Sequence, residues 1–277
     1  MIDKNELLHK HRLFRIPLAT CEKDYVLGLI LWGIYQHPTI KEDWVFKGGT
    51  CLKKCYFQTY RFSEDLDFTL KPYASIEPEV ILTYLKDVFT TVWNHCGLKV
   101  DVSHINMMPF PDKEGLFIQI KVPFQGPLLS SGSLPKIKLD LSRQEILVSP
   151  TIQKPLLHNY SDHAALQTEI QCYSFIEIFA EKLRAFVERV RPRDLYDIVH
   201  LHQRFDSKDK ETLLHVIEKK FTLKNLNFPS ALHNLSLEKL EAIYVDWEIM
   251  LAHQIFPLDP FEAYKCNQEK LFEWLLA

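Results

Sequence analysis

The sequence predicts an α/β protein, with a core of mixed strands and helices over residues 1–155 and a mainly helical region over residues 156–277. Two observations carry this prediction. Between residues 98 and 148, apolar and polar residues alternate, as they do in strands that bury one face. After Pro155 the apolar residues recur with the period of a helix, so we expect the chain to be helical from there to its end.

The composition is that of an ordinary globular protein. Of the 277 residues, 47% are hydrophobic and 25% are charged, which suits one large domain or two small ones. The formal net charge of −3 provides no overall basic field for nucleic acid, although it leaves room for a local basic groove. The six cysteines contain no CxxC pair, and we expect buried, reduced thiols, Cys51 and Cys55 among them, in a cytosolic protein.

The N-terminal part begins with a short basic amphipathic segment over residues 6–16 and a helix over residues 22–36 that is apolar nearly all round and should be buried. The first six residues are too polar for a secretory signal. The longest apolar run, residues 25–35, is too short to span a bilayer. We therefore expect a cytoplasmic protein without a membrane partner. A further helix is predicted over residues 77–95, ended by Gly97.

The centre of the pattern is a glycine turn followed by an acidic strand. The apolar run 44–46 leads into Gly48-Gly49-Thr50 and a helix to about Phe57, a turn whose free N–H groups suit a phosphate. In the strand 65–70, Asp65 and Asp67 share one face, and Leu66 and Phe68 face the core. A divalent cation such as Mg²⁺ removes the repulsion between two such carboxylates. Each motif alone has a common alternative, a plain turn and a solvated strand edge.

Three more strands are predicted within residues 98–148, over residues 99–102, 116–122 and 136–142. The last shows the sharpest alternation, with its polar face formed by Lys136, Lys138, Asp140 and Ser142. An Asp on the polar face of a strand is normally solvent-exposed. If this strand lies beside the strand 65–70, however, all three aspartates share a face, an arrangement that suits metal-assisted phosphoryl chemistry.

The helical region contains two candidate residues. A helix over residues 174–190 begins with a capping box formed by Ser174 and Glu177. Lys182 lies at the border of its apolar stripe, where a lysine often directs its ammonium group into solvent. Pro192 ends this helix, and Asp194 is well placed to cap the next one. Four arginines around this junction would form either a basic rim or a solvated helix end: Arg189, Arg191, Arg193 and Arg204.

The remaining residues, 208–277, read as three helices separated by turns near residues 225–229 and 256–260, without recognisable chemistry. His200 and His202 lie two residues apart and do not share a helical face, which argues against a histidine zinc site. No Ser–His–Asp or Cys–His nucleophile set stands out in the sequence.

Four motifs, in order over about residues 40–205, resemble those of the AbiEii/AbiGii-type nucleotidyltransferase toxin family, within the polymerase-β-like nucleotidyltransferase superfamily. The first is Gly-Gly-Thr-x-Leu with Arg-x-Ser-Glu-Asp-Leu-Asp-Phe, and Thr50 stands where the superfamily usually has serine. The others are Lys-x-Asp-x-Ser at residues 138–142, Glu-Lys-Leu-Arg-Ala at 181–185 and Arg-Asp-x-x-Asp at 193–197.

The resemblance implies a nucleotidyltransferase core with a mixed sheet and a helical region that completes the active site. It implies transfer of a nucleoside monophosphate from an NTP, with Mg²⁺ as cofactor, to an acceptor that is the 3′ end of tRNA by preference. The protein would act as a toxin with a cognate antitoxin protein. The implied catalytic residues are Asp65, Asp67, Asp140, Lys182 and Asp194, of which the first three hold the metal. The implied nucleotide-binding residues are Gly48, Gly49, Thr50, Ser63 and Lys182.

Two alternatives stay open. A small-molecule nucleotidyltransferase of the antibiotic-modifying kind uses the same core, and would need a closed pocket in place of an open basic groove. The second alternative is a degenerate core that is kept for binding a partner, although the intact acidic, glycine and lysine motifs argue against it.

Overall fold

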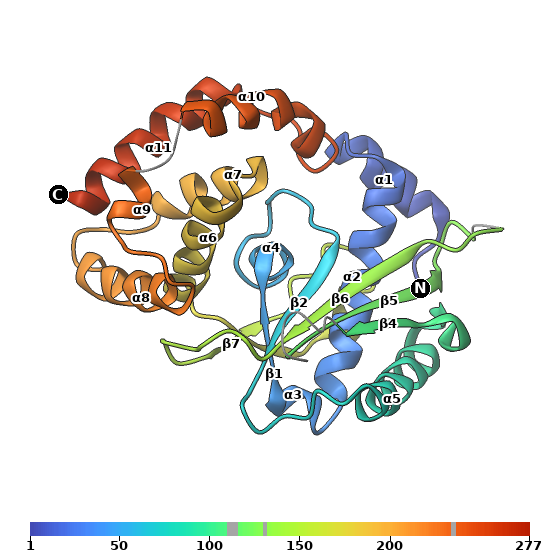
Figure 1. The fold of residues 1–277 in the computed structure, drawn as a ribbon. Helices are drawn as coiled ribbons and strands as arrows, with labels where there is room; N and C mark the ends of the chain where they lie inside the picture. The colour runs from blue at the N-terminus through green and yellow to red at the C-terminus, as the bar shows by residue number, and fades with distance from the viewer. Residues whose placement is uncertain (110–115, 130–131, 234–236) are drawn as a thin grey trace. The chain divides into compact units, whose positions relative to one another are not determined.

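The computed structural model describes residues 1–109, 116–129, 132–233 and 237–277. It divides into two compact units (Figure 1). The first comprises residues 1–145 and 151–172, and the second residues 146–150 and 173–277. The sequence-based boundary at residue 155 differs from this division, because a strand at residues 169–172 completes the sheet of the first unit.

The first unit contains an eight-stranded mixed sheet and the helices that pack on it. Its strands lie in the order β3-β5-β6-β2-β1-β8-β7, with β4 beside β5. The bounds are β1 Trp44–Lys47, β2 Asp65–Leu70, β3 Lys99–Val100, β4 Asn106–Pro109, β5 Phe117–Gln125, β6 Lys136–Ser142, β7 Ile152–Pro155 and β8 Glu169–Cys172. Strand β2 is parallel to β6 and β1 is parallel to β8, whereas the other neighbours are antiparallel. The prediction of a mixed α/β fold is confirmed.

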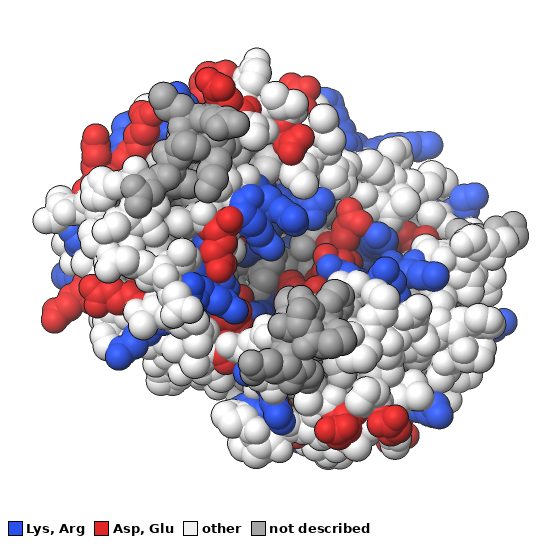
Figure 2. Space-filling model, viewed as in Figure 1, with Lys and Arg blue, Asp and Glu red and all other residues white. Residues whose placement is uncertain are grey.

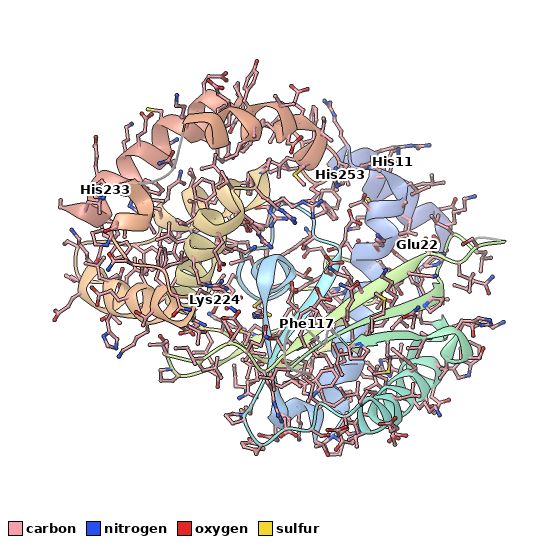
Figure 3. The ribbon with its side chains drawn as sticks, in the orientation of Figure 1. His11, Glu22, Phe117, Lys224, His233 and His253 are labelled. Carbon is pink, nitrogen blue, oxygen red and sulfur yellow. The ribbon has the colours of Figure 1, made fainter. Side chains whose placement is uncertain are left out.

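The helices of the first unit are α1 Lys4–Phe14, α2 Leu18–Gln36, α3 Ile40–Asp43, α4 Gly48–Cys51 and α5 Pro78–Cys96. Helix α2 is buried almost all round, as its apolar composition predicts, and packs against α5. It also supports the turn after β5, since the Leu128 N–H donates to Glu22 Oε1 over 2.8 Å (Figure 3). Gly97 ends α5, as predicted, and it does so in the left-handed conformation.

Several predicted elements differ from those observed. The helix expected over residues 50–57 is α4 followed by a π-helical turn, Leu52–Tyr56. The strand expected over residues 99–102 ends at Val100, because a 3₁₀ turn begins at Val102. The expectation that the chain is helical after Pro155 is wrong, since β8 pairs with β1 and β7. Strand β8 has only four residues, too few for a clear periodic signal.

The second unit is helical. Its elements are α6 Phe175–Arg189, α7 Pro192–His202, α8 Lys210–Leu223, α9 Ser230–His233, α10 Leu237–Leu251 and α11 Phe261–Leu276. Helix α6 packs on α7 and α8, and α7 also packs on α10 and α11. Among the described helices, none combines the length and the apolar composition needed to cross a bilayer.

The predicted capping box at the start of α6 forms only in part. The Glu177 N–H donates to Ser174 Oγ over 3.2 Å. The Glu177 carboxylate instead accepts from the N–H groups of Val148 and Ser149 and pairs with Lys220 Nζ at 2.7 Å, with both charged side chains fully buried. This pair ties residues 146–150 to α6 and α8, which explains why that segment belongs to the second unit.

Candidate active site

In the first unit, three aspartates gather on one face of the sheet. Asp67 on β2 is the register partner of Asp140 on β6, and Asp65 pairs in the same ladder with Lys138. Side chains at partner positions of neighbouring strands, and at alternate positions of one strand, share a face. The sequence therefore predicted correctly that the three carboxylates would share a face if the two strands were neighbours. The opposite face is core, with Leu66 and Phe68 fully buried.

A lysine that the sequence reading left without a role bridges two of these carboxylates. Lys138 Nζ lies 3.1 Å from Asp65 Oδ2 and 3.1 Å from Asp140 Oδ2. Burial acts to lower the pKa of Lys138, but the charges of Asp65 and Asp140 outweigh it and the pKa is raised. Its spacing of two residues from Asp140 on a strand was the signal that could have identified it. Gln119 on β5 holds the same aspartate, donating to Asp140 Oδ1 over 3.2 Å.

The pKa of Asp65 is raised above its ordinary value. Burial is the main cause, and Lys138 opposes it while the negative charges of Asp140 and Glu64 add to it. The three carboxylates share this face with Lys138, and Lys47 of β1 is the register partner of Asp67. The donors are hard oxygens on adjacent strands, which fits the ligands that Mg²⁺ takes in proteins. The oxygens of the three aspartates do not all lie within 4.8 Å of one another. Among the described residues, the one set of three potential ligand atoms that is this close is formed by cysteines.

The glycine turn lies directly against this acidic face. Gly48 has a φ of +79°, and a Cβ there would lie 2.2 Å from Asp67 Oδ2. A Cβ on Gly49 would lie 2.8 Å from Arg61 Nη2 and 3.1 Å from Ser63 Oγ. The Thr50 hydroxyl donates to the backbone oxygen of Asp65, so it anchors the turn to β2. The structure therefore brings the predicted turn residues and the acidic strand together.

In the second unit, two buried aspartates of α7 hold Lys182 of α6. Lys182 Nζ lies 2.8 Å from Asp197 Oδ2 and 3.7 Å from Asp194 Oδ1. Both aspartates are fully buried, and 12% of the Lys182 side chain is exposed. The carboxylates thus fix the ammonium group of Lys182. The alternative, in which this group is directed into solvent, is wrong. Asp197 was not among the predicted site residues, although it is the last residue of the Arg-Asp-x-x-Asp motif.

The prediction that Asp194 caps a helix is wrong. Helix α7 begins at Pro192 with Arg191 in the capping position, which places Asp194 inside the first turn. Arg189 Nε and Nη2 donate to the two carboxylate oxygens of Asp194 over 2.6 and 2.8 Å. Arg189 is therefore occupied by an ion pair and does not contribute a free charge to the expected basic rim. On the face drawn in Figure 2, Lys and Arg side chains lie among Asp and Glu side chains.

Comparisons with known proteins agree with these motifs. None of the curated proteins matches the chain. The solved structures that resemble it include MenT4, a nucleotidyltransferase toxin from Mycobacterium tuberculosis, at 18% identity and a TM-score of 0.64, covering 98% of this chain and 87% of that one. They also include JHP933 from Helicobacter pylori, at 17% identity and a TM-score of 0.58, covering 94% of this chain and 93% of that one. At these identities the likeness shows the fold.

The family comparison extends over most of the chain. Residues 29–277 match the family described as "Nucleotidyl transferase AbiEii toxin, Type IV TA system". The match contains the glycine turn, the acidic strands and the Lys182 motif. The chain therefore belongs to the AbiEii family of nucleotidyltransferase toxins.

Proposed function

We propose that this toxin transfers a nucleoside monophosphate from an NTP to the 3′ end of tRNA in a Mg²⁺-dependent reaction, and that a cognate antitoxin protein opposes it. The observation that carries the proposal is the face shared by Asp65, Asp67 and Asp140, with the Gly48–Gly49 turn against it. Acidic ligands next to a phosphate-binding turn are what a metal–triphosphate substrate requires.

In the proposed reaction, an acceptor hydroxyl oxygen forms a bond to the α-phosphorus of the NTP. The bond between that phosphorus and the bridging oxygen of the β-phosphate breaks, and pyrophosphate leaves. Gln119 and Lys138 hold Asp140 in place, so its carboxylate orients the attacking hydroxyl, whose proton passes to solvent. When bound by Asp65, Asp67 and Asp140, Mg²⁺ supplies charge neutralisation and alignment of the triphosphate.

The remaining residues hold the substrate in this proposal. The backbone N–H groups at Gly49 and Thr50 and the Ser63 hydroxyl bind phosphate oxygens, and no side chain at Gly48 obstructs Asp67. By the family resemblance, Lys182 contacts the nucleotide phosphates, and the buried carboxylates of Asp194 and Asp197 set the direction of its ammonium group. Asp194 is thus a positioning residue here.

The experiment is incubation of the purified protein with total tRNA, Mg²⁺ and each of the four NTPs labelled at the α-phosphate, followed by gel autoradiography. We expect labelled tRNA with at least one NTP, and loss of the label with EDTA. Asp67→Ala should abolish labelling, whereas the matched control Asp87→Ala, which removes an exposed carboxylate on α5, should not. Periodate treatment of the tRNA destroys its terminal diol and should remove labelling at the 3′ end.

The arms of this experiment separate the parts of the proposal. Labelling that survives periodate places the modification elsewhere on the tRNA. A parallel reaction contains aminoglycosides as well as tRNA. Label on the aminoglycosides, with none on tRNA, favours the small-molecule alternative and leaves the proposed transferase chemistry intact. Undiminished labelling by Asp67→Ala contradicts the metal assignment itself.

A further inference from the structure

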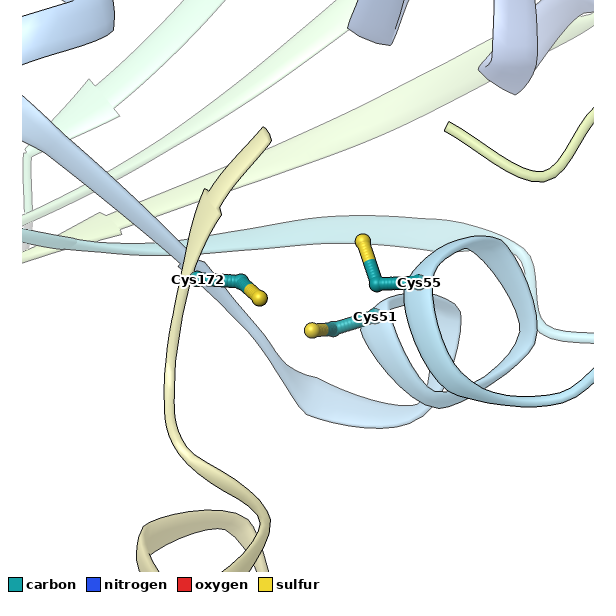
Figure 4. Close-up of side chains that lie close together, drawn as sticks. All are labelled: Cys51, Cys55 and Cys172. Atoms are coloured by element: carbon teal, nitrogen blue, oxygen red, sulfur yellow. The ribbon is translucent and has the colours of Figure 1, made fainter. Parts of the chain in front are cut away.

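Three cysteines that are distant in the sequence come together in the first unit. Cys51 ends α4, Cys55 lies in the π-helical turn and Cys172 ends β8. Their sulfur atoms all lie within 4.8 Å of one another (Figure 4). All three residues are buried, with 0%, 4% and 0% of their surface exposed respectively. Among the described residues, this is the one group of three His, Cys, Asp or Glu side chains that is gathered so closely.

The fold explains why the sulfur atoms meet. Cys51 and Cys55 are four residues apart in one continuous helical segment, so they share a face of it. Strand β1 leads directly into this segment and runs parallel to β8, with Phe46 opposite Cys172. The end of β8 therefore lies beside the start of α4. A π-helical turn within a helical segment is a rare feature that is frequent at functional sites.

The cluster has the geometry of a metal site. A zinc–thiolate bond is about 2.3 Å long, so three sulfurs around one ion lie roughly 3.8–4.0 Å apart, which needs only small side-chain rotations from the observed arrangement. A disulfide requires a sulfur–sulfur distance of about 2.05 Å and occupies only two of the three cysteines. Burial of all three ligands matches structural zinc sites, which are closed to water.

Polar groups lie next to the sulfur atoms. The Tyr56 hydroxyl hydrogen-bonds to Cys172. Lys154 brings a positive charge to the same place, with its Nζ 5.2 Å from the centre of the Tyr56 ring.

We propose that Cys51, Cys55 and Cys172 form a binding site for a thiophilic metal ion of the zinc type. Thiolates select soft or borderline ions over Mg²⁺, so the site is chemically distinct from the acidic face of the sheet. Cys51 directly follows Thr50, so an ion held by the three sulfurs fastens the helix that carries the glycine turn to β8. The proposal stands on the geometry of the cluster and does not depend on the tRNA acceptor or on transfer activity.

The test starts from full-length protein purified with a thiol reductant and without chelator. Elemental analysis should find about one zinc ion per chain. After the ion is removed with a chelator, titration with Co²⁺ should produce the thiolate-to-cobalt charge-transfer absorption of a site with several sulfur ligands. Cys172→Ser and Cys55→Ala should each weaken Co²⁺ binding by more than the ~10–100-fold that loss of a supporting residue costs.

The matched control is Cys21→Ser, because Cys21 is equally buried in the same unit and lies outside the cluster. It should keep the ion and the cobalt spectrum. Since replacing a buried cysteine can itself unfold the chain, the melting temperature of each protein is also measured with and without added Zn²⁺. It should rise with Zn²⁺ in the wild type and in Cys21→Ser, and should not respond in the cluster variants.

Three results would overturn the proposal. The first is wild-type protein that holds no more zinc, and binds Co²⁺ no better, than the variants of Cys55 and Cys172. The second is equal loss of the ion from Cys21→Ser, which would show a general effect of losing a thiol. The third is intact-mass and peptide analysis that finds two of the three cysteines joined as a disulfide in the purified protein. None of these results bears on the transferase reaction, so the two proposals fail separately.

Discussion

Replacing Gly48 by alanine tests the close approach of the glycine turn to the acidic strand. Gly48 has a φ of +79°, and the added Cβ would lie 2.2 Å from Asp67 Oδ2. The chain supplies a matched control in Gly97, which has a φ of +70° and nothing within 4 Å of the position of its Cβ. The two variants share the backbone penalty, and only Gly48→Ala adds a contact with Asp67.

The shared penalty is modest. A left-handed conformation costs an alanine about 1–2 kcal/mol. For a domain of this size, each kcal/mol lowers the melting temperature by roughly 2–4 °C, so Gly97→Ala should lose about 2–8 °C. At Gly48 the nearest atom is the end of a side chain that can rotate, and the Asp67 Cβ at 3.1 Å needs to give way only slightly, so the extra loss of stability should be modest. The Asp67 carboxylate must move by about 1 Å, however, and a misplacement of that size can cost about 10²-fold in rate.

The assays are thermal unfolding by circular dichroism and the tRNA-labelling rate with the preferred NTP. We expect both variants to unfold at similar temperatures, and Gly48→Ala to label tRNA about a hundred times more slowly than Gly97→Ala. If the labelling rate of Gly48→Ala is within about threefold of the rate of Gly97→Ala, the position of Asp67 does not depend on the absence of a side chain at residue 48. The close approach of the turn to Asp67 would then have no catalytic role.

Three other predictions concern the buried charges. Burial lowers the pKa of His158 below its ordinary 6.5 and Asp162 opposes this, so the unfolded state binds the proton more tightly. Stability should therefore fall as the pH drops from 6.5 through the folded value, and His158→Gln should reduce that slope in pH-dependent urea unfolding, although His37, His200 and His202 keep part of it. Asp194→Asn should lower the melting temperature as well as activity, because it weakens charged hydrogen bonds worth about 1.5–3 kcal/mol each; an unchanged melting temperature would contradict a stabilising role for the Arg189–Asp194 pair. Lys220→Met should destabilise the second unit by about 3–5 kcal/mol in chemical unfolding, and adding Glu177→Gln should recover part of this loss if the buried charge is the cause.

Periodicity was enough to place each aspartate on the polar face of its own strand. Alternation placed Asp65 and Asp67 on one side of a strand and Asp140 on the polar side of another, and the observed register confirms both. The order of the strands is a different matter, because it depends on pairing between distant segments. The family resemblance, and not the residues themselves, led to the expectation that these two strands are neighbours.

Local patterns failed where a distant partner competes. Asp194 has the residue type and position of a capping residue, but Pro192 already occupies the first turn and Arg189 takes both carboxylate oxygens. Glu177 similarly gives its carboxylate to Lys220 and to backbone N–H groups in place of its own helix start. The cysteine cluster left no sequence signal, because the parallel pairing of β1 with β8 brings Cys172 to Cys51 across the whole sheet-forming region.

The parallel pairing of β2 with β6, and of β1 with β8, also sets the order in which the acidic face and the sheet are completed during synthesis of the chain. A ribosome adds roughly 5–20 residues per second, so Asp67 leaves it several seconds before Asp140 and longer still before β8. Until then β1 and β2 are strands with unpaired edges, which are open to pairing with other chains. A nascent chain that stops before Asp140 has no complete acidic face, and one that stops before β8 still offers chaperones and proteases the exposed edge of β1 to recognise.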